Sequence, residues 1–201
     1  VSLIGAGLTG ANIRAQQARL ELDHLTLLSA LNIGLDAEDS SLELSDSIFP
    51  GDGLTQAVRA QRIPANGKFV LSRNLFNKLI STNAVVSVTD ARLPHSQAQI
   101  VDNNFLGGAD DLVQLANADA YLEGNLFARA KGEATRPNDL ASAVTVIGDE
   151  STPTPVTATL LRNRFLSNDH GIVVRNGARI TAAHNTFQSI GFAAVAFDEP
   201  L

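Results

Sequence analysis

Residues 98–127 read AQIVDNNFLGGADDLVQLANADAYLEGNLF, and this stretch contains two copies of one pattern. Each copy has two apolar positions separated by one residue, then an Asn, then a Phe two residues further on. The positions are Ala98, Ile100, Asn103 and Phe105 in the first copy, and 22 residues later Ala120, Leu122, Asn125 and Phe127. Apolar residues at every second position are typical of a β-strand with one buried face. The pattern therefore predicts short strands that recur with each turn of about 22 residues.

The same element recurs along the chain. Further copies of Asn-x-Phe end at Phe76, Phe165 and Phe187, and Ser47-Ile48-Phe49 is a weaker copy. With Leu27 as the earliest member, the anchors Leu27, Phe49, Phe76, Phe105, Phe127, Phe165 and Phe187 are separated by 22, 27, 29, 22, 38 and 22 residues. Because no step is shorter than 22, we interpret the longer steps as insertions into a fixed repeat.

Three columns of apolar residues accompany the anchors. Five residues before each anchor stand Leu22, Leu44, Leu71, Ile100, Leu122, Leu160 and Ala182. Seven before stand Leu20, Leu42, Phe69, Ala98, Ala120, Ala158 and Ile180. A third column, eight residues after the anchor or displaced by small insertions, contains Ile13, Leu35, Ala57, Val86, Val113, Val144, Val173 and Val195.

These columns predict three strands per turn, each stacked on its counterpart in the next turn. A single turn cannot bury its own apolar face, whereas stacked turns share one core. Stacked Asn side chains can hydrogen-bond along the axis, and Asn tolerates the left-handed backbone of a sharp corner. We therefore predict an all-β, right-handed parallel β-helix of seven to eight turns of about 22 residues, with residues 1–201 as a single domain.

The corner Asn and the inward apolar positions resemble those of the right-handed parallel β-helix superfamily, which includes pectate lyases, polygalacturonases and tailspikes. Residues 169–174 and 184–187 are most similar to β-helix regions of bacterial secreted or surface multidomain proteins. The resemblance covers nearly the whole chain and implies fold more than activity.

Four insertions interrupt the repeat. We expect residues 59–67, 89–97 and 149–156 to emerge at one corner after the third strand of a turn, and 130–141 at the opposite end of that strand. Together they would flank a shallow cleft on the outer face of the third sheet, where superfamily members that act on polysaccharides hold their substrate. Alternation places Ser87, Gln114, Thr145 and Ala196 on this face, which is polar and largely uncharged.

Two short segments are candidates for catalysis. Asp110-Asp111 and Asp169-His170-Gly171 are similar to the acidic pair and the His-Gly element of polygalacturonases. The upstream Asn-Thr-Asp and downstream Arg-Ile-Lys of that family are missing, and the two segments should lie about two turns apart. A solvated corner is therefore the competing interpretation of Asp110, Asp111, Asp169 and His170.

Four other residues are candidates for contacts with a substrate. An enzyme would need charged groups converging from neighbouring turns, and Arg92, His95, Arg129 and Lys131 are the candidates. The four histidines lack the spacing of metal ligands. No cofactor is expected, although calcium would be the ion for a lyase acting on uronates.

Composition excludes some classes of protein. The 15 basic and 21 acidic side chains leave a formal charge of −6, which argues against nucleic acid as the main partner. No apolar stretch approaches the roughly 20 residues that span a bilayer. Neither end shows a capping helix, so we expect a segment of a larger protein with flanking domains, or end-on contacts with partners.

These observations favour a non-catalytic module of an extracellular or cell-surface protein, a rigid scaffold that could also bind carbohydrate. The first alternative is a polysaccharide lyase, epimerase or glycoside hydrolase with its site between the insertion loops. The second is a structural subunit that docks by its solenoid ends.

Overall fold

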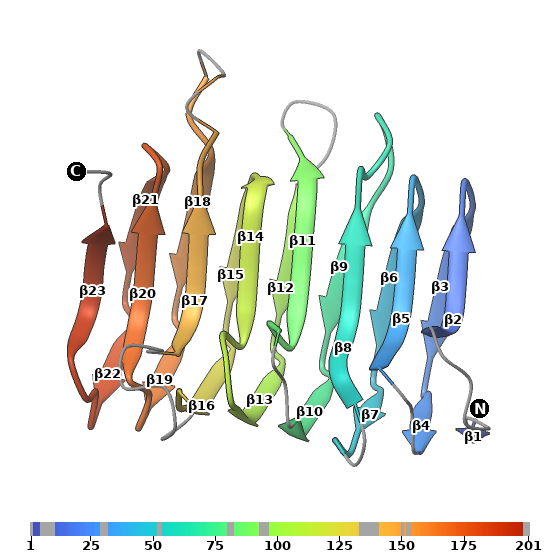
Figure 1. Cartoon of the computed structure of the whole chain (residues 1–201), viewed down its shortest axis with the longest axis horizontal. Helices are drawn as coiled ribbons and strands as arrows, with labels where there is room; N and C mark the ends of the chain where they lie inside the picture. Colours follow the sequence, from blue (N-terminus) through green and yellow to red (C-terminus); the bar gives the residue numbers. More distant parts are fainter. Residues whose placement is uncertain are drawn as a thin grey trace.

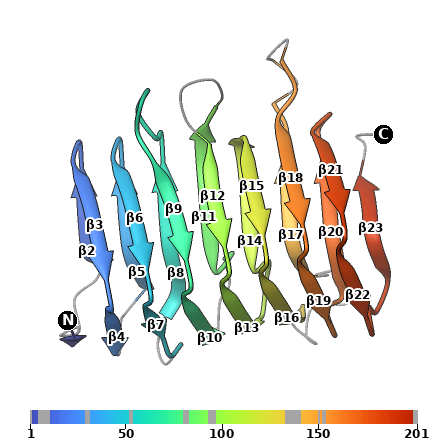
Figure 2. The same cartoon turned by 180° about the vertical axis from the view of Figure 1, so that it is seen from behind.

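The chain forms a right-handed parallel β-helix. The computed structural model describes residues 2–4, 11–28, 32–51, 54–79, 83–92, 97–132, 141–149, 151 and 154–198. All strand pairs in these ranges are parallel, and the strands stack into three sheets along one axis (Figures 1 and 2). The described residues contain no helix, and so none that is long and apolar enough to cross a membrane.

Each turn contributes one strand to each sheet. The first sheet contains β3 (Arg19–Asp23), β6 (Ser41–Ser45), β9 (Phe69–Ser72), β12 (Ala98–Val101), β15 (Ala120–Glu123), β18 (Thr157–Leu161) and β21 (Arg179–Ala183). The second contains β1 (Ser2–Ile4), β4 (Thr26–Leu28), β7 (Ile48–Phe49), β10 (Leu75–Leu79), β13 (Asn104–Gly108), β16 (Leu126–Ala130), β19 (Arg164–Leu166) and β22 (Thr186–Gln188). The third contains β2 (Ala11–Gln16), β5 (Asn32–Glu38), β8 (Leu54–Gln61), β11 (Val86–Ala91), β14 (Val113–Ala118), β17 (Ser142–Ile147), β20 (His170–Arg175) and β23 (Ala193–Asp198).

The core forms as the repeat predicts. Both apolar columns of the first sheet pair in the predicted register, from Leu20 and Leu22 to Ile180 and Ala182. On the second sheet the phenylalanine rings stack face to face from Phe49 to Phe187, with centroids 4.6–5.2 Å apart. This ring spacing follows from the strand spacing of about 4.8 Å, since each ring belongs to one strand of the sheet.

Two members of the predicted third column are displaced by one residue in the strand pairing. Leu35 pairs with Val58, not Ala57, because a bulge after Asn32 adds one residue to β8, although Ala57 is itself fully buried in the core. Val144 pairs with Ile172, not Val173, so Val173 lies in the outward row beside Ala196. Ala57 and Val58 are both core residues. In β20 the shift of one residue exchanges the inner and outer faces, so Ile172 is the core residue there and Val173 is not.

The asparagine ladder is confirmed, but its backbone conformation differs from the prediction. At each rung the side-chain oxygen of the next Asn accepts the backbone N–H of the one before, from Ser47 to Asn185 at 2.8–3.0 Å. The left-handed residue is the one that precedes each Asn: Arg73, Asp102, Gly124, Arg162 and His184 have φ of 54–67°. The turn is made before the Asn, which leaves its side chain free to bond along the axis.

The longer connections leave one edge of the third sheet, at the top of Figure 1, after β8, β11 and β17. Residues 59–61 and 89–91 of the expected insertions belong to β8 and β11, which extend to Gln61 and Ala91. The segment 130–141 joins β16 to β17 at the opposite edge, and its residues 133–140 are outside the described ranges.

Candidate functional site: a polar groove on the third sheet

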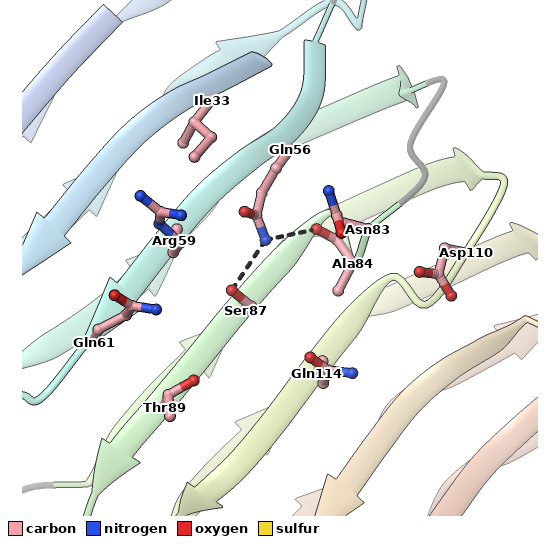
Figure 3. A pocket seen from close by; sticks show the side chains of 10 residues that line it. All are labelled: Ile33, Gln56, Arg59, Gln61, Asn83, Ala84, Ser87, Thr89, Asp110 and Gln114. Atoms are coloured by element: carbon pink, nitrogen blue, oxygen red, sulfur yellow. Dashed lines mark hydrogen bonds between the residues drawn. The ribbon is translucent and has the colours of Figure 1, made fainter. Parts of the chain in front are cut away.

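A groove of about 320 Å³ lies on the outer face of the third sheet, across β5, β8, β11 and β14. Figure 3 shows its ten lining residues: Ile33, Gln56, Arg59, Gln61, Asn83, Ala84, Ser87, Thr89, Asp110 and Gln114. This is the face on which the sequence predicts a shallow cleft. Most of these side chains are amides or hydroxyls, which both donate and accept hydrogen bonds.

The bulge in β8 builds the groove floor. The extra residue re-aims Gln56, whose side chain is only 6% exposed. Its Nε2 donates to the carbonyl oxygen of Ala84 at 3.1 Å and to the hydroxyl of Ser87 at 3.0 Å (Figure 3). Gln56 therefore ties β8 to the next turn and holds the Ser87 hydroxyl in place. A bulge beside a binding surface commonly has this role of directing a side chain.

Arg59 forms one side of the groove, and its guanidinium is held by Asp36 on the neighbouring strand β5. Nε and Nη2 of Arg59 donate to the two carboxylate oxygens of Asp36 at 2.9 and 2.8 Å. Asp36 is 5% exposed. The bidentate hydrogen bond to Asp36 raises the pKa of Arg59 above its ordinary value. The guanidinium is thus held in a fixed position at the side of the groove, and its positive charge is balanced by Asp36.

The other arginines of this region also have carboxylate partners. Nη2 of Arg14 donates to Glu38 at 2.9 Å, and Arg62 pairs with Glu38 and with Asp39, the latter at 2.9 Å from Nε. The hydrogen bonds from Arg62 are the largest cause that lowers the pKa of both carboxyl groups. Positive charge beside the groove is therefore balanced locally.

Asp110 and Asp111, adjacent in sequence, have different surroundings. Asp110 lines the groove (Figure 3). Asp111 is buried, and its Oδ1 accepts the backbone N–H of Ser142 at 2.8 Å. Burial raises the pKa of Asp111, against the lowering effect of hydrogen bonds from Thr145 and Ser142. Asp111 thus caps the start of β17 from inside, while Asp110 lines the groove.

Asp169 and His170 lie near the same edge, two turns further on. Asp169 accepts from Nζ of Lys131 at 2.8 Å and from the backbone N–H of Gly132 at 2.8 Å. His170 pairs in register with Ser142, and its ring stacks on Phe192 with centroids 5.5 Å apart. Within the described part of the chain, His170 Nδ1 is a buried nitrogen without a hydrogen-bond partner. Neither Asp169 nor His170 lines the groove.

The four candidates for substrate contact are spread along the molecule. Arg92 follows β11 at one edge of the third sheet, where it bonds Asp119 at 3.1 Å, Asn117 at 2.9 Å and the carbonyls of Thr154 and Pro155 at 2.8 and 3.2 Å. Lys131 and the exposed Arg129 belong to the opposite edge, at the end of β16, and none of the three lines the groove. His95 lies outside the described residues. In the part that the structure describes, no three His, Asp or Glu side chains are grouped to hold a metal ion.

Seven of the ten lining residues were not named from the sequence: Ile33, Gln56, Arg59, Gln61, Asn83, Ala84 and Thr89. A signal exists for Gln56. Leu35 and Val58 are 23 residues apart although the unperturbed repeat is 22, and this extra residue is the bulge that presents Gln56. Ser87, Gln114 and Thr145 were placed on this face correctly, since they pair as one outward row. Thr145 is buried, however, and contributes nothing to the groove.

The fold and this site together define a class: a parallel β-helix that carries a polar groove across four turns of one sheet. Comparison with protein-family models, with curated proteins and with solved structures found no match for the chain.

Proposed function

We propose that the chain is a non-catalytic binding module that holds an extended polysaccharide in the groove of the third sheet. The observation that carries this proposal is the groove itself, about 320 Å³ in volume and lined mainly by amide and hydroxyl side chains on paired strands. Sugars present closely spaced hydroxyls, and side chains such as Gln61, Ser87 and Gln114 match them as donors and acceptors. Rigid strands reduce the entropy lost on binding.

The geometry of the acidic groups supports binding over catalysis. Hydrolysis by the usual route needs two carboxyl groups about 5–9.5 Å apart across the scissile bond. Among the ten residues described as lining the groove, Asp110 is the one carboxylate. Asp111 and Asp169 are engaged by the backbone and by Lys131. Asp110 is also the observation that favours the alternative, a polysaccharide lyase, epimerase or hydrolase, because it faces the groove.

The proposal also includes the superfamily and the cellular location of the chain. The corner Asn ladder and stacked Phe column support membership of the pectate-lyase-like β-helix superfamily, as a rigid module of a bacterial secreted or cell-surface protein. An assembly role through the solenoid ends is favoured by one feature, the exposed Val195 and Phe197 of β23. Sedimentation velocity over a hundredfold concentration range would test it, since end-on assembly requires species that grow with concentration.

The binding proposal is tested on a panel of soluble polysaccharides by affinity electrophoresis and calorimetry. We expect Gln114→Ala, in the groove, to weaken binding of the retained polymer about fivefold to tenfold, since a hydrogen bond contributes about 1 kcal/mol. Gln99→Ala is the matched control, because Gln99 is an exposed outward Gln on the first sheet. Equal effects of both variants, or no retention of any polymer, would contradict the proposal.

The enzyme alternative is separated by assaying the same polymers for new reducing ends and unsaturated products. We expect none. Product formation that disappears in Asp110→Asn would establish the enzyme and identify Asp110 as catalytic.

A further inference from the structure

The charge arrangement of the groove specifies which polysaccharides it can hold. Arg59 is the one cation among the ten residues described as lining it. A guanidinium recognises a carboxylate or sulfate through paired N–H donors, and in Arg59 the Nε and Nη2 donors both go to Asp36. An acidic sugar would have to displace Asp36 to use this pair of donors, and the N–H groups that remain on Arg59 belong to a guanidinium whose charge Asp36 already balances.

Displacing Asp36 is costly because of where it lies. The carboxylate is almost fully buried, and its other near cation, Arg14, has its Nε 3.8 Å away and donates from Nη2 to Glu38 instead. Loss of Arg59 would leave a buried carboxylate with one distant partner, which is strongly unfavourable. The positive charge of Arg59 is therefore compensated by a carboxylate that stays in place, and it adds little attraction for an anionic ligand.

The opposite side of the groove carries a carboxylate, Asp110 (Figure 3). An anionic ligand that spans the groove would bring its charges close to this group. Like charges at short separation oppose binding, most strongly at low ionic strength. A binding site can discriminate between ligands by repelling one of them as well as by adding contacts to the other.

From these contacts we infer that the groove discriminates against acidic polysaccharides and takes uncharged ones, with the Arg59–Asp36 pair as the element that withholds positive charge. This inference rests on the proposed binding function. It adds the class of ligand and the residues that determine it.

The test uses matched polymers that share a backbone and differ mainly in charge: methyl-esterified homogalacturonan and its free acid, dextran and dextran sulfate, and cello-oligosaccharides with their C6-oxidised forms. We expect at least one neutral member to bind, with its acidic counterpart at least about fivefold weaker at low salt and the difference shrinking at high salt. An acidic member that binds as tightly as its neutral counterpart would overturn the inference and leave the binding function standing. Failure of every polymer would overturn both.

Two variants locate the selectivity. Asp36→Asn should release the charge of Arg59 and raise the affinity for acidic chains several-fold, with little change for neutral ones. Asp46→Asn is the matched control, because Asp46 holds Arg73 in the same two-bond geometry, at 2.8 and 2.5 Å, at a corner beside the first sheet. If Asp36→Asn fails to fold, as judged by circular dichroism, Asp110→Asn tests the repulsion part of the inference and should raise the affinity for acidic chains relative to that for neutral ones. An equal gain in Asp46→Asn, or no gain in either groove variant, would contradict the assignment.

Discussion

Asn103 bonds Asn125 twice, although 22 residues separate them: its backbone N–H and its side-chain Nδ2 both donate to Oδ1 of Asn125, at 2.9 and 3.1 Å. Nδ2 of Asn103 also donates to the carbonyl of Leu71, at 2.9 Å. One buried side chain thus connects three turns.

The first prediction concerns this ladder. Asn103→Ala removes the acceptor for the N–H and Nδ2 of Asn74 and leaves these donors buried, which should lower the free energy of unfolding by about 2–4 kcal/mol. Urea denaturation is the measurement. Asn104→Ala is the control, because Asn104 is exposed and outward and should change stability by no more than about 0.5 kcal/mol. Similar losses in both variants would mean that the ladder is not a source of stability.

The phenylalanine stack gives the second prediction. Phe105 is fully buried between Phe76 and Phe127, with centroids 4.8 and 5.0 Å away, and Phe105→Ala should cost about 3–5 kcal/mol. Phe105→Leu should cost less than half of that, since Leu27 fills the same column in an earlier turn. Phe192, which is 66% exposed, is the control, and its Ala variant should unfold at nearly the wild-type urea concentration.

The third prediction separates two effects of adding a Cβ at a glycine. Gly124 and Gly177 share a φ of +67°, so each Ala variant carries the left-handed cost of about 1–2 kcal/mol. At Gly124 the Cβ would also lie 2.2 Å from Oδ1 of Asp102, whereas at Gly177 nothing lies within 4 Å. Gly124→Ala should therefore be the more destabilising.

Removing the Asp102 side chain should abolish the difference between the two glycine positions. In a double-mutant cycle Gly124→Ala should cost less in an Asp102→Ala background, approaching the cost of Gly177→Ala. Additive effects would show that Asp102 moves aside without strain.

The fourth prediction is a pH dependence with a defined sign. Burial raises the pKa of Asp111 above its ordinary value of 3.8, so the folded state holds this proton more tightly than the unfolded state. Stability from this group is complete below the unfolded pKa and is lost as pH rises through the folded pKa. Asn keeps the acceptor for Ser142 without ionising. Asp111→Asn should therefore raise the melting temperature at pH 7, and the gain should vanish near pH 3.

Asp46 provides the opposite case. Its hydrogen bond to Arg73 lowers the pKa of Asp46, so its contribution is present above the ordinary pKa and is lost as pH falls through the folded value. Asp46→Asn should lower the melting temperature slightly at pH 7 and leave it unchanged in acid. The same sign for both variants at pH 7 would show that burial does not control Asp111.

The fifth prediction concerns Arg92, which joins the end of β11 to the segment before β18. Lysine cannot reproduce its contacts with Asp119, Asn117 and the carbonyls of Thr154 and Pro155. Arg92→Lys should lower the free energy of unfolding by about 1–3 kcal/mol and speed proteolysis within 148–156. Arg129→Lys, at an exposed position, should change neither. Unchanged cleavage in Arg92→Lys would contradict a structural role and return Arg92 to the candidates for ligand contact.

The repeat by itself determined the architecture of this protein. In stacked parallel strands, residues one turn apart occupy equivalent core positions and are chemically alike. The core of a β-helix can therefore be recognised in the sequence as columns of apolar residues, such as the one that contains Phe105 and Phe127. The cleft face was predictable for the same reason, because alternation places Ser87 and Gln114 outward once the register is known.

Only the tertiary structure decided the register within that lattice and the state of each charged group. The β8 bulge made Val58, and not Ala57, the partner of Leu35, and Gln56 beside the bulge lines the groove, because one inserted residue shifts the register of a strand. The sequence likewise shows Asp36 and Arg59 as two charges 23 residues apart. Their bidentate pairing depends on strands of adjacent turns lying side by side, and that contact determines the charge that the groove offers to a ligand.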